Sequence, residues 1–143
     1  MNLPTEVFID TSFFIALTNS SDEDHLHAIT LQRRLQSQAI RKITSEYVLV
    51  ELGDGLSRFK VRSLAQQVIE SVRRDPKFEI IPASTSLFVQ ALHLFQNRPD
   101  KEWGMTDCSS FVIMQQMELY AVLTADHHFE QAGFLPILRA NNF

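Results

Sequence analysis

The sequence is poor in the residues that stabilise small secreted domains or dominate flexible chains. Its 143 residues include one cysteine, Cys108, which excludes an internal disulfide and a zinc site built from several cysteines. Only four glycines and five prolines occur, against 45% hydrophobic residues, so the chain is neither collagen-like nor disordered. A chain of this length forms one ordinary domain with its own core, and we predict a single domain over residues 1–143.

Long hydrophobic runs are absent as well. The longest cover about five residues, as in 13–17, whereas a membrane-spanning helix needs about 20. The N-terminus has no basic segment, and Asp10-Thr11-Ser12 interrupts the stretch that a signal peptide would keep apolar. No glycine-rich phosphate loop or serine elbow is present, because the four glycines are scattered. The sequence therefore indicates a cytoplasmic protein without membrane association.

Basic residues are concentrated in the middle of the chain. Residues 33–77 contain ten Lys/Arg and five Asp/Glu, a net charge of +5, whereas the remainder carries −9. The total of −4 argues against a chain that binds polyanions over its whole surface. The asymmetry is compatible with a nucleic-acid surface beside an acidic centre, but charge alone fits solvated helix faces equally well.

Short apolar runs alternate with segments of helical spacing. Strands are predicted at 7–9, 43–44, 78–81, 121–124 and 135–138. Pro136 confines the last of these to an edge of the sheet, because proline has no N–H to donate. Helical segments between the strands predict crossover connections, a mostly parallel sheet and helices on both faces. The predicted fold class is therefore α/β, a single-domain α/β/α sandwich.

Capping residues and apolar spacing predict where the helices begin and which residues they bury. Ser45, either Ser84 or Ser86, and Thr106 are the predicted N-caps, and Asp75-Pro76 ends a helix. Apolar residues at helical spacing predict the faces that pack against the core. These residues are Leu26, Ile29, Leu35, Tyr47, Val48, Leu52, Leu56, Phe59, Leu64, Val68, Val72, Leu87, Phe88, Ala91, Leu92 and Phe95.

Four acidic residues occupy positions that point to a functional site. Asp10 and Asp126 each follow an apolar strand, and ligands bind outside the carboxyl ends of parallel strands. Asp107 lies in the first turn of a predicted helix, and Glu51 lies close to the apolar face of its helix. Taken singly, each acid also fits a turn residue, a partner of a helix dipole or a solvated side chain.

Together, the four carboxylates predict a metal centre. Acids crowded at one edge of a sheet repel one another, so they take up protons unless a cation neutralises them. Oxygen ligands suit Mg²⁺ or Mn²⁺, with water molecules completing the coordination shell. Such an ion activates water and holds a phosphodiester in line for displacement. The residues therefore predict phosphodiester hydrolysis without a covalent intermediate.

Four segments around these acids occur in a particular order: Phe8-Ile9-Asp10-Thr11-Ser12, residues 45–51 (SEYVLVE), residues 103–109 (WGMTDCS) and residues 123–129 (LTADHHF), with residues 131–134 (QAGF) following. This ordered set resembles the acidic motifs of PIN-domain nucleases, and among them the VapC-type toxins. The resemblance extends from about residue 7 to residue 138. It implies a metal-dependent endoribonuclease of PIN-like fold, the toxin of a type II toxin–antitoxin pair.

The resemblance also implies roles for individual residues. The acids that match the family's metal-site and catalytic positions are Asp10, Glu51, Asp107 and Asp126. The residues that match positions supporting the ions or the phosphate are Thr11, Ser12, Ser109 and Thr124. His128 departs from part of the family, because some members place a further aspartate there. One firmly bound Mg²⁺ or Mn²⁺ is therefore expected.

The partners expected are an RNA substrate guided by the Lys and Arg of residues 33–77, a small antitoxin protein and a second copy of the chain. The helix pair 47–72 has too much Leu, Val and Phe for one face, which fits a homodimer surface, a partner groove or ordinary core packing. One alternative is a non-catalytic PIN-like module that binds RNA or protein; the presence of all four acids argues against it. A phospho-accepting signalling domain also places an aspartate at a strand end, but Ile9 stands where its second acid belongs. His127 and His128 either touch a substrate phosphate or only form part of the loop.

Overall fold

The strands of the computed structural model form one parallel sheet. The structure describes residues 2–58 and 60–139. Its strands are β1 (Glu6–Ile9), β2 (Arg41–Ser45), β3 (Phe78–Ile81), β4 (Ala121–Leu123) and β5 (Leu135–Pro136), paired in the order β3-β2-β1-β4-β5. Every pairing is parallel, so the carboxyl ends of all five strands meet at one edge. The parallel α/β sheet is confirmed, and Pro136 lies on an edge strand.

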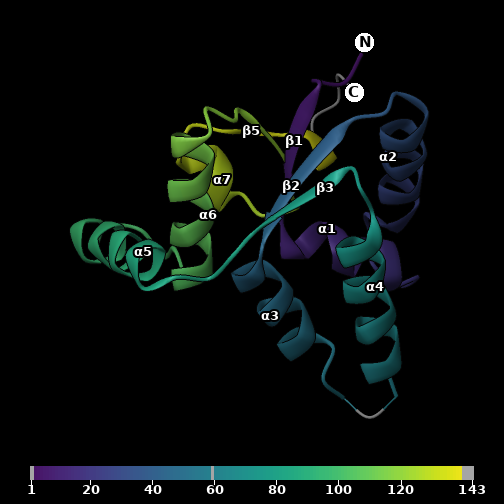
Figure 1. Cartoon of the computed structure of the whole chain (residues 1–143), viewed down its shortest axis with the longest axis horizontal. Helices are drawn as coiled ribbons and strands as arrows, with labels where there is room; N and C mark the ends of the chain where they lie inside the picture. The colour runs from purple at the N-terminus through teal and green to yellow at the C-terminus, as the bar shows by residue number, and fades with distance from the viewer. Residues whose placement is uncertain (1, 59, 140–143) are drawn as a thin grey trace.

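Helices cover both faces of this sheet. They are α1 (Thr11–Thr18), α2 (His25–Ser37), α3 (Glu46–Gly55), α4 (Arg62–Arg74), α5 (Thr85–Asn97), α6 (Met105–Gln116) and α7 (His128–Gln131), with a 3-10 turn η1 at Ile137–Arg139. In Figure 1, α2 and α4 lie on one side of the sheet, α5 and α6 lie on the other, and α3 extends from the strands' carboxyl ends. This arrangement is the predicted α/β/α sandwich. Within the described ranges, no helix combines the length and apolar character needed to cross a bilayer.

The predicted N-caps are correct for two helices and wrong for a third. Ser45 Oγ accepts the Val48 N–H over 3.1 Å at the start of α3, and Ser84 Oγ accepts the Leu87 N–H over 3.0 Å at the start of α5. Helix α6 begins one residue before Thr106, with Gly104 as its N-cap. The carboxylate of Asp107, and not the Thr106 hydroxyl, satisfies the free N–H of Gly104 over 3.2 Å.

Three residues predicted to face the core are exposed instead. Leu26 is 81% exposed on α2, where Ala28, Leu31 and Leu35 form the buried stripe. On α5, Phe88 and Phe95 are 49% and 45% exposed. The helix buries Leu87 and Ala91, so its apolar residues form two adjacent stripes of which only one faces the core. The remaining prediction of this kind, Phe59, lies outside the described residues.

Candidate active site

Asp10 and Asp126 leave neighbouring strands at the same edge of the sheet. Ile9, the last residue of β1, pairs with Leu123, the last residue of β4. The Asp10 N–H continues this pairing by donating to the Leu123 carbonyl over 3.1 Å. The loop after β4 then carries Asp126 past the end of β1. Parallel pairing of the two central strands therefore places these acids beside each other.

Two hydroxyls hold the buried carboxylate of Asp10. Ser12 Oγ and Thr124 Oγ1 donate to Asp10 Oδ2 over 2.9 and 2.8 Å, and Asp10 is only 4% exposed. Each hydroxyl has one proton, so its oxygen remains free to accept a backbone N–H. Ser12 Oγ accepts the Ala125 N–H and Thr124 Oγ1 accepts the Asp126 N–H, both over 2.9 Å. This network fixes the Asp10 carboxylate and the loop that carries Asp126 as one unit.

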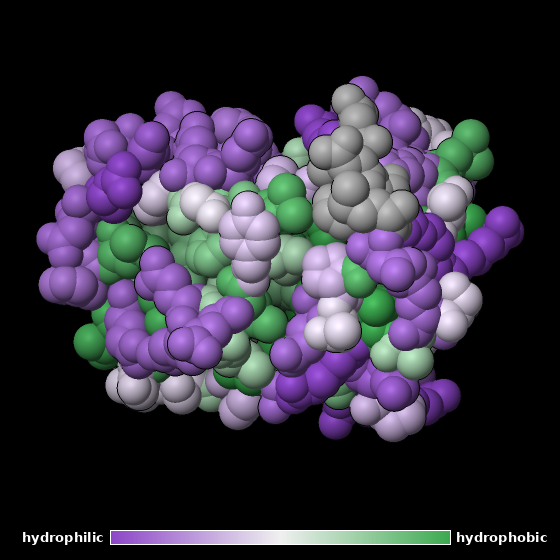
Figure 2. All heavy atoms as spheres, turned by 90° about the horizontal axis from the view of Figure 1, so that it is seen from above, coloured by the Kyte–Doolittle hydropathy of each residue, from purple (hydrophilic) through white to green (hydrophobic). Residues whose placement is uncertain are grey.

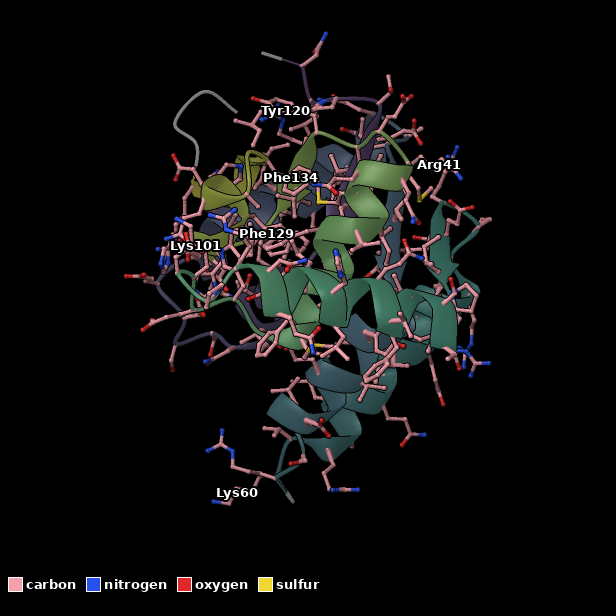
Figure 3. The ribbon with its side chains drawn as sticks, turned by 90° about the vertical axis from the view of Figure 1, so that its left-hand side faces the viewer. Arg41, Lys60, Lys101, Tyr120, Phe129 and Phe134 are labelled. Atoms are coloured by element: carbon pink, nitrogen blue, oxygen red, sulfur yellow. The ribbon has the colours of Figure 1, made fainter. Side chains whose placement is uncertain are left out.

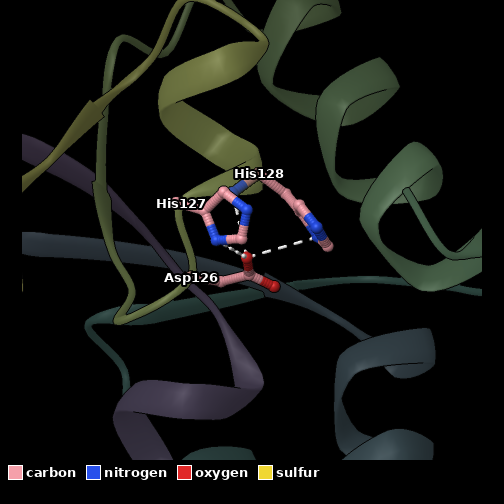
Figure 4. A group of neighbouring side chains, drawn as sticks. All are labelled: Asp126, His127 and His128. Carbon is pink, nitrogen blue, oxygen red and sulfur yellow. Dashed lines mark hydrogen bonds and ion pairs between the residues drawn. The ribbon is translucent and has the colours of Figure 1, made fainter. Parts of the chain in front are cut away.

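His128 connects the other two acids. Its Nδ1 lies 3.0 Å from Asp107 Oδ2. The same nitrogen lies 3.2 Å from Asp126 Oδ1, a contact drawn in Figure 4. The His128 backbone N–H also donates to Asp126 Oδ1 over 2.9 Å, which fixes the turn between the two residues. Asp107 comes from the first turn of α6, on a different segment from Asp126. The imidazole of His128 thus lies between carboxylates supplied by two parts of the chain.

Aromatic packing fixes the position of α7, which carries His128. Phe129 is fully buried and meets Phe111 of α6 edge-to-face, with ring centroids 4.9 Å apart. Phe111 in turn contacts Trp103 edge-to-face at 5.0 Å. The Trp103 Nε1–H donates to Gln131 Oε1 of α7 over 3.0 Å. These contacts hold a helix of only four residues against α6, beside the first turn that supplies Asp107.

Burial and mutual repulsion destabilise the charged forms of two of these acids. Burial, and after it the negative charge of Asp107, raises the pKa of Asp10 to about 6, although hydrogen bonds from Thr124 and Ser12 act in the opposite direction. Burial also raises the pKa of Asp107, followed by the charge of Asp126, while the hydrogen bond with His128 lowers it. The three carboxylates therefore lie close enough for their charges to interact.

The donor set fits a hard divalent cation. At Asp107 every hydrogen bond from the described chain ends on Oδ2, and at Asp126 on Oδ1. The second oxygen of each carboxylate makes no hydrogen bond within the described residues. At Asp10 both hydroxyls likewise end on Oδ2. Carboxylate oxygens held in this way are the ligands that Mg²⁺ and Mn²⁺ prefer, and an ion there offsets the repulsion among them.

The four predicted supporting residues have different environments. Ser12 and Thr124 bind Asp10 directly, as described above. The Ser109 hydroxyl is buried and donates to the Thr106 carbonyl over 2.6 Å, within its own helix. The Thr11 hydroxyl is also buried and has no hydrogen-bond partner among residues 2–58 and 60–139. An unpaired buried hydroxyl beside Asp10 is uncommon and suits a site that binds a polar ligand.

Glu51 is the one predicted acid that the structure does not link to the others by a contact. It lies on α3, which packs against both α1 and α6, the helices that begin beside Asp10 and Asp107. Its side chain is exposed, and within the described residues it makes no hydrogen bond or ion pair. Its place in the metal site remains a prediction.

The basic middle of the chain does not form one RNA-facing surface. Lys42 is 4% exposed and pairs with Asp75 over 2.8 Å, so it is not available to a partner. Arg41 pairs with Glu6 and Glu79 at the amino ends of the strands, the edge opposite the acids. Figure 3 shows Arg41 and Lys60 at opposite ends of the molecule. The expectation that this whole region guides RNA is wrong for Lys42.

The bridging role of His128 is the feature that the sequence did not reveal. Its neighbour Asp126 predicts a turn, and an aspartate two residues before a histidine fits the observed bond from Asp126 to the His128 N–H. The contact with Asp107, which is 21 residues away, depends on the packing of α7 against α6. A four-residue helix has no periodicity from which that packing follows.

Comparisons with known proteins agree with this fold. The 23S rRNA-specific endonuclease VapC20 of two Mycobacterium tuberculosis strains is 27% identical over 131 residues, which cover 92% of this chain and 97% of the relative. The crystal structure of M. tuberculosis VapC20, described as a sarcin–ricin loop cleaving toxin, superposes with a TM-score of 0.79 at 26% identity, over 92% of this chain and 98% of that one.

A second solved structure, FitAcB from Neisseria gonorrhoeae, has a TM-score of 0.62 at 16% identity and covers 91% of this chain and 94% of its own. At that identity the likeness concerns the fold alone. The family model described as the PIN domain matches residues 7–135, which include β2, β3, β4, most of β1 and all four predicted acids. The chain belongs to the PIN domain family.

Proposed function

We propose that this protein is a divalent-metal-dependent endoribonuclease and the toxin of a type II toxin–antitoxin pair. The observation that carries the proposal is the meeting of Asp10, Asp107 and Asp126 at one edge of the sheet, where burial and mutual repulsion raise the pKa of the first two. The relative VapC20 is named a 23S rRNA-specific endonuclease, which favours RNA as the substrate. Its structure is described as that of a toxin, which supports the same role here.

In this proposal Asp10, Asp107, Asp126 and Glu51 hold one Mg²⁺ or Mn²⁺. The bound ion supplies activation of water and neutralisation of charge on the phosphodiester oxygens. Ser12 and Thr124 keep the Asp10 carboxylate in one orientation through their bonds to its Oδ2. Preorganised ligands lower the cost of binding, because little conformational freedom remains to be lost. Thr11 and Ser109 are the further hydroxyls proposed to contact ion-bound water or phosphate.

We propose that the RNA backbone is contacted by cations at the carboxyl-end side of the molecule. Arg58 and Lys60 are exposed in the connection between α3 and α4, and Lys60 lies at its far tip in Figure 3. Arg62 follows at the start of α4 and donates to the Ser57 carbonyl over 2.9 Å. These side chains can contact phosphates along a strand whose scissile bond lies at the acids.

The proposed location of the protein is the cytoplasm, where RNA is found.

The proposed protein partners are a second copy of the chain and a small antitoxin. The predicted dimer surface is the helix pair 47–72. Its apolar side chains within 47–58 and 60–72 are buried or half-buried, with Val50 as the exception at 62% exposed. Helix α5 instead exposes Phe88 and Phe95, which are seven residues apart and lie on one stripe. Val89 beside them lines a cavity of about 500 Å³ between α5 and α6. Figure 2 shows apolar residues in a hollow on the half of the molecule where these helices lie. We propose the α5 stripe as the dimer surface.

Asp107→Asn should reduce cleavage of RNA at least about 100-fold while leaving the fold intact, because the amide keeps the shape but loses the charge that holds a cation. Labelled hairpin and unstructured RNAs are incubated with Mn²⁺, Mg²⁺ or a chelator and resolved on gels. The matched control is Glu102→Gln, because Glu102 is an exposed acid just before α6. This variant should cleave RNA at the wild-type rate. Binding of RNA without any metal-dependent cleavage by the wild type would support a non-catalytic module instead.

Asp10→Asn should stabilise the metal-free protein at pH 7 by about 1–3 kcal/mol, because it removes a buried negative charge. The pKa of the Asp10 carboxyl is higher in the folded protein than in the unfolded chain, so its ionisation at pH 7 opposes folding. The wild type then loses stability as the pH rises from about 4 through about 6, since its folded state holds the Asp10 proton over that range. Urea unfolding at several pH values measures this. An Asn variant that is less stable than the wild type, with the same pH dependence, would show that Asp10 does not destabilise the folded protein at pH 7.

Expression of the chain alone should arrest bacterial growth, whereas the Asp107→Asn variant should be tolerated at the same protein level. Co-expression of the small open reading frame beside the gene should restore growth, as expected for an antitoxin. Colony counts and immunoblots together measure both effects. Normal growth with an active nuclease in the cell would remove the toxin role and leave the enzymatic one.

Phe88→Glu should convert a dimer into a monomer, because a charge in the centre of an apolar contact is costly to bury. Sedimentation equilibrium at tens of micromolar protein distinguishes the two masses. The control is Leu26→Glu, since Leu26 is more exposed than Phe88 but is the only exposed large apolar residue of α2, and this variant should remain dimeric. A monomeric wild type, or a dimeric Phe88→Glu variant, would exclude α5 as the dimer surface.

A further inference from the structure

His128 is placed like a metal ligand and not like a surface histidine. Its side chain is only 18% exposed, and Nδ1 faces Asp107 Oδ2 at 3.0 Å and Asp126 Oδ1 at 3.2 Å. Both its backbone, through the bond to Asp126, and its helix, through Phe129, are fixed. The imidazole therefore stays between the two carboxylates without any movement of the chain.

The spacing of these three atoms corresponds to the geometry of a coordination shell. Metal–nitrogen and metal–oxygen bonds to such ligands are about 2.0–2.2 Å long. Ligands at right angles around one ion therefore lie about 3 Å apart. The two distances from Nδ1 match this value, so an ion can replace the proton that now joins nitrogen and oxygen.

We propose that His128 is a nitrogen ligand of the metal ion and makes the centre select a transition-metal ion such as Mn²⁺ over Mg²⁺. The inference rests on the proposed metal-dependent function. Mg²⁺ prefers oxygen ligands and binds imidazole weakly, whereas first-row transition-metal ions accept imidazole nitrogen as a ligand more readily. An aspartate at this position would complete an all-oxygen site. The histidine instead gives a mixed set of two or more carboxylates and one nitrogen.

His127 provides a matched control for this proposal. It is the adjacent residue and has the same chemistry, but its side chain is 71% exposed and its Nδ1 lies 3.7 Å from Asp126 Oδ1. In Figure 4 the two imidazoles approach Asp126 from different directions. Of the two histidines, only His128 contacts Asp107. Substitution of His127 therefore tests whether any imidazole near the ion, and not only a coordinated one, produces the nitrogen signal.

The test is electron paramagnetic resonance of Mn²⁺ added to the full-length wild type and to His128→Asp, His128→Asn and His127→Gln variants. Spin-echo modulation from ¹⁴N should be present in the wild type and in His127→Gln, and absent in both His128 variants. Competition titrations should show that His128→Asp lowers the preference for Mn²⁺ over Mg²⁺ at least about tenfold. Circular dichroism verifies that each variant is folded.

Two results would overturn the proposal. Mn²⁺ bound by the wild type without nitrogen modulation, or modulation that persists in both His128 variants, would show that His128 is not a ligand, and the metal-dependent nuclease would stand. A wild type that binds no Mn²⁺ at all would remove the metal centre, and with it both the proposed function and the role of His128. The two failures are therefore distinguished by the binding titration itself.

Discussion

The hydrogen bonds from Ser12 and Thr124 to one oxygen of Asp10 join the two central strands at the point where both end. A carboxylate directly after a buried strand is costly in the core, and hydroxyl donors compensate only part of that cost. The remainder appears as the raised pKa of Asp10. The hydrogen bonds hold Asp10 in place although its charged form is unfavourable there. Binding of a cation to this carboxylate is favourable because the cation neutralises that charge.

The rest of the site is built outward from this pair of strands. The oxygen of Thr124 that serves Asp10 also accepts the N–H of Asp126, so the orientation of the second acid depends on the first. His128 then extends the network from Asp126 to Asp107 on α6. Segments that are more than one hundred residues apart in the sequence are thereby connected through a few short contacts. Packing of α7 against α6 fixes His128 beside Asp107.

The sequence predicted features that depend on local patterns and missed those that depend on tertiary contact. An apolar run followed by an acid indicated both the strand ends and the candidate residues Asp10 and Asp126. The outward direction of Phe88 could not be predicted, because a helix with two adjacent apolar stripes has the same spacing as one with a broad buried face. The role of His128 depends on the burial of Phe129. This burial could not be predicted from the sequence, because a helix of four residues is too short to show an apolar periodicity.

Asp107 Oδ2 accepts two hydrogen bonds, one from the Gly104 N–H and one with His128 Nδ1. The same atom therefore closes the first turn of α6 and takes part in the acidic cluster. A ligand that draws this oxygen away weakens the cap, and the connection that leads into the helix gains freedom as a result. Binding of a ligand to this oxygen would therefore change the order of residues 98–104, a segment that itself carries no acid of the cluster.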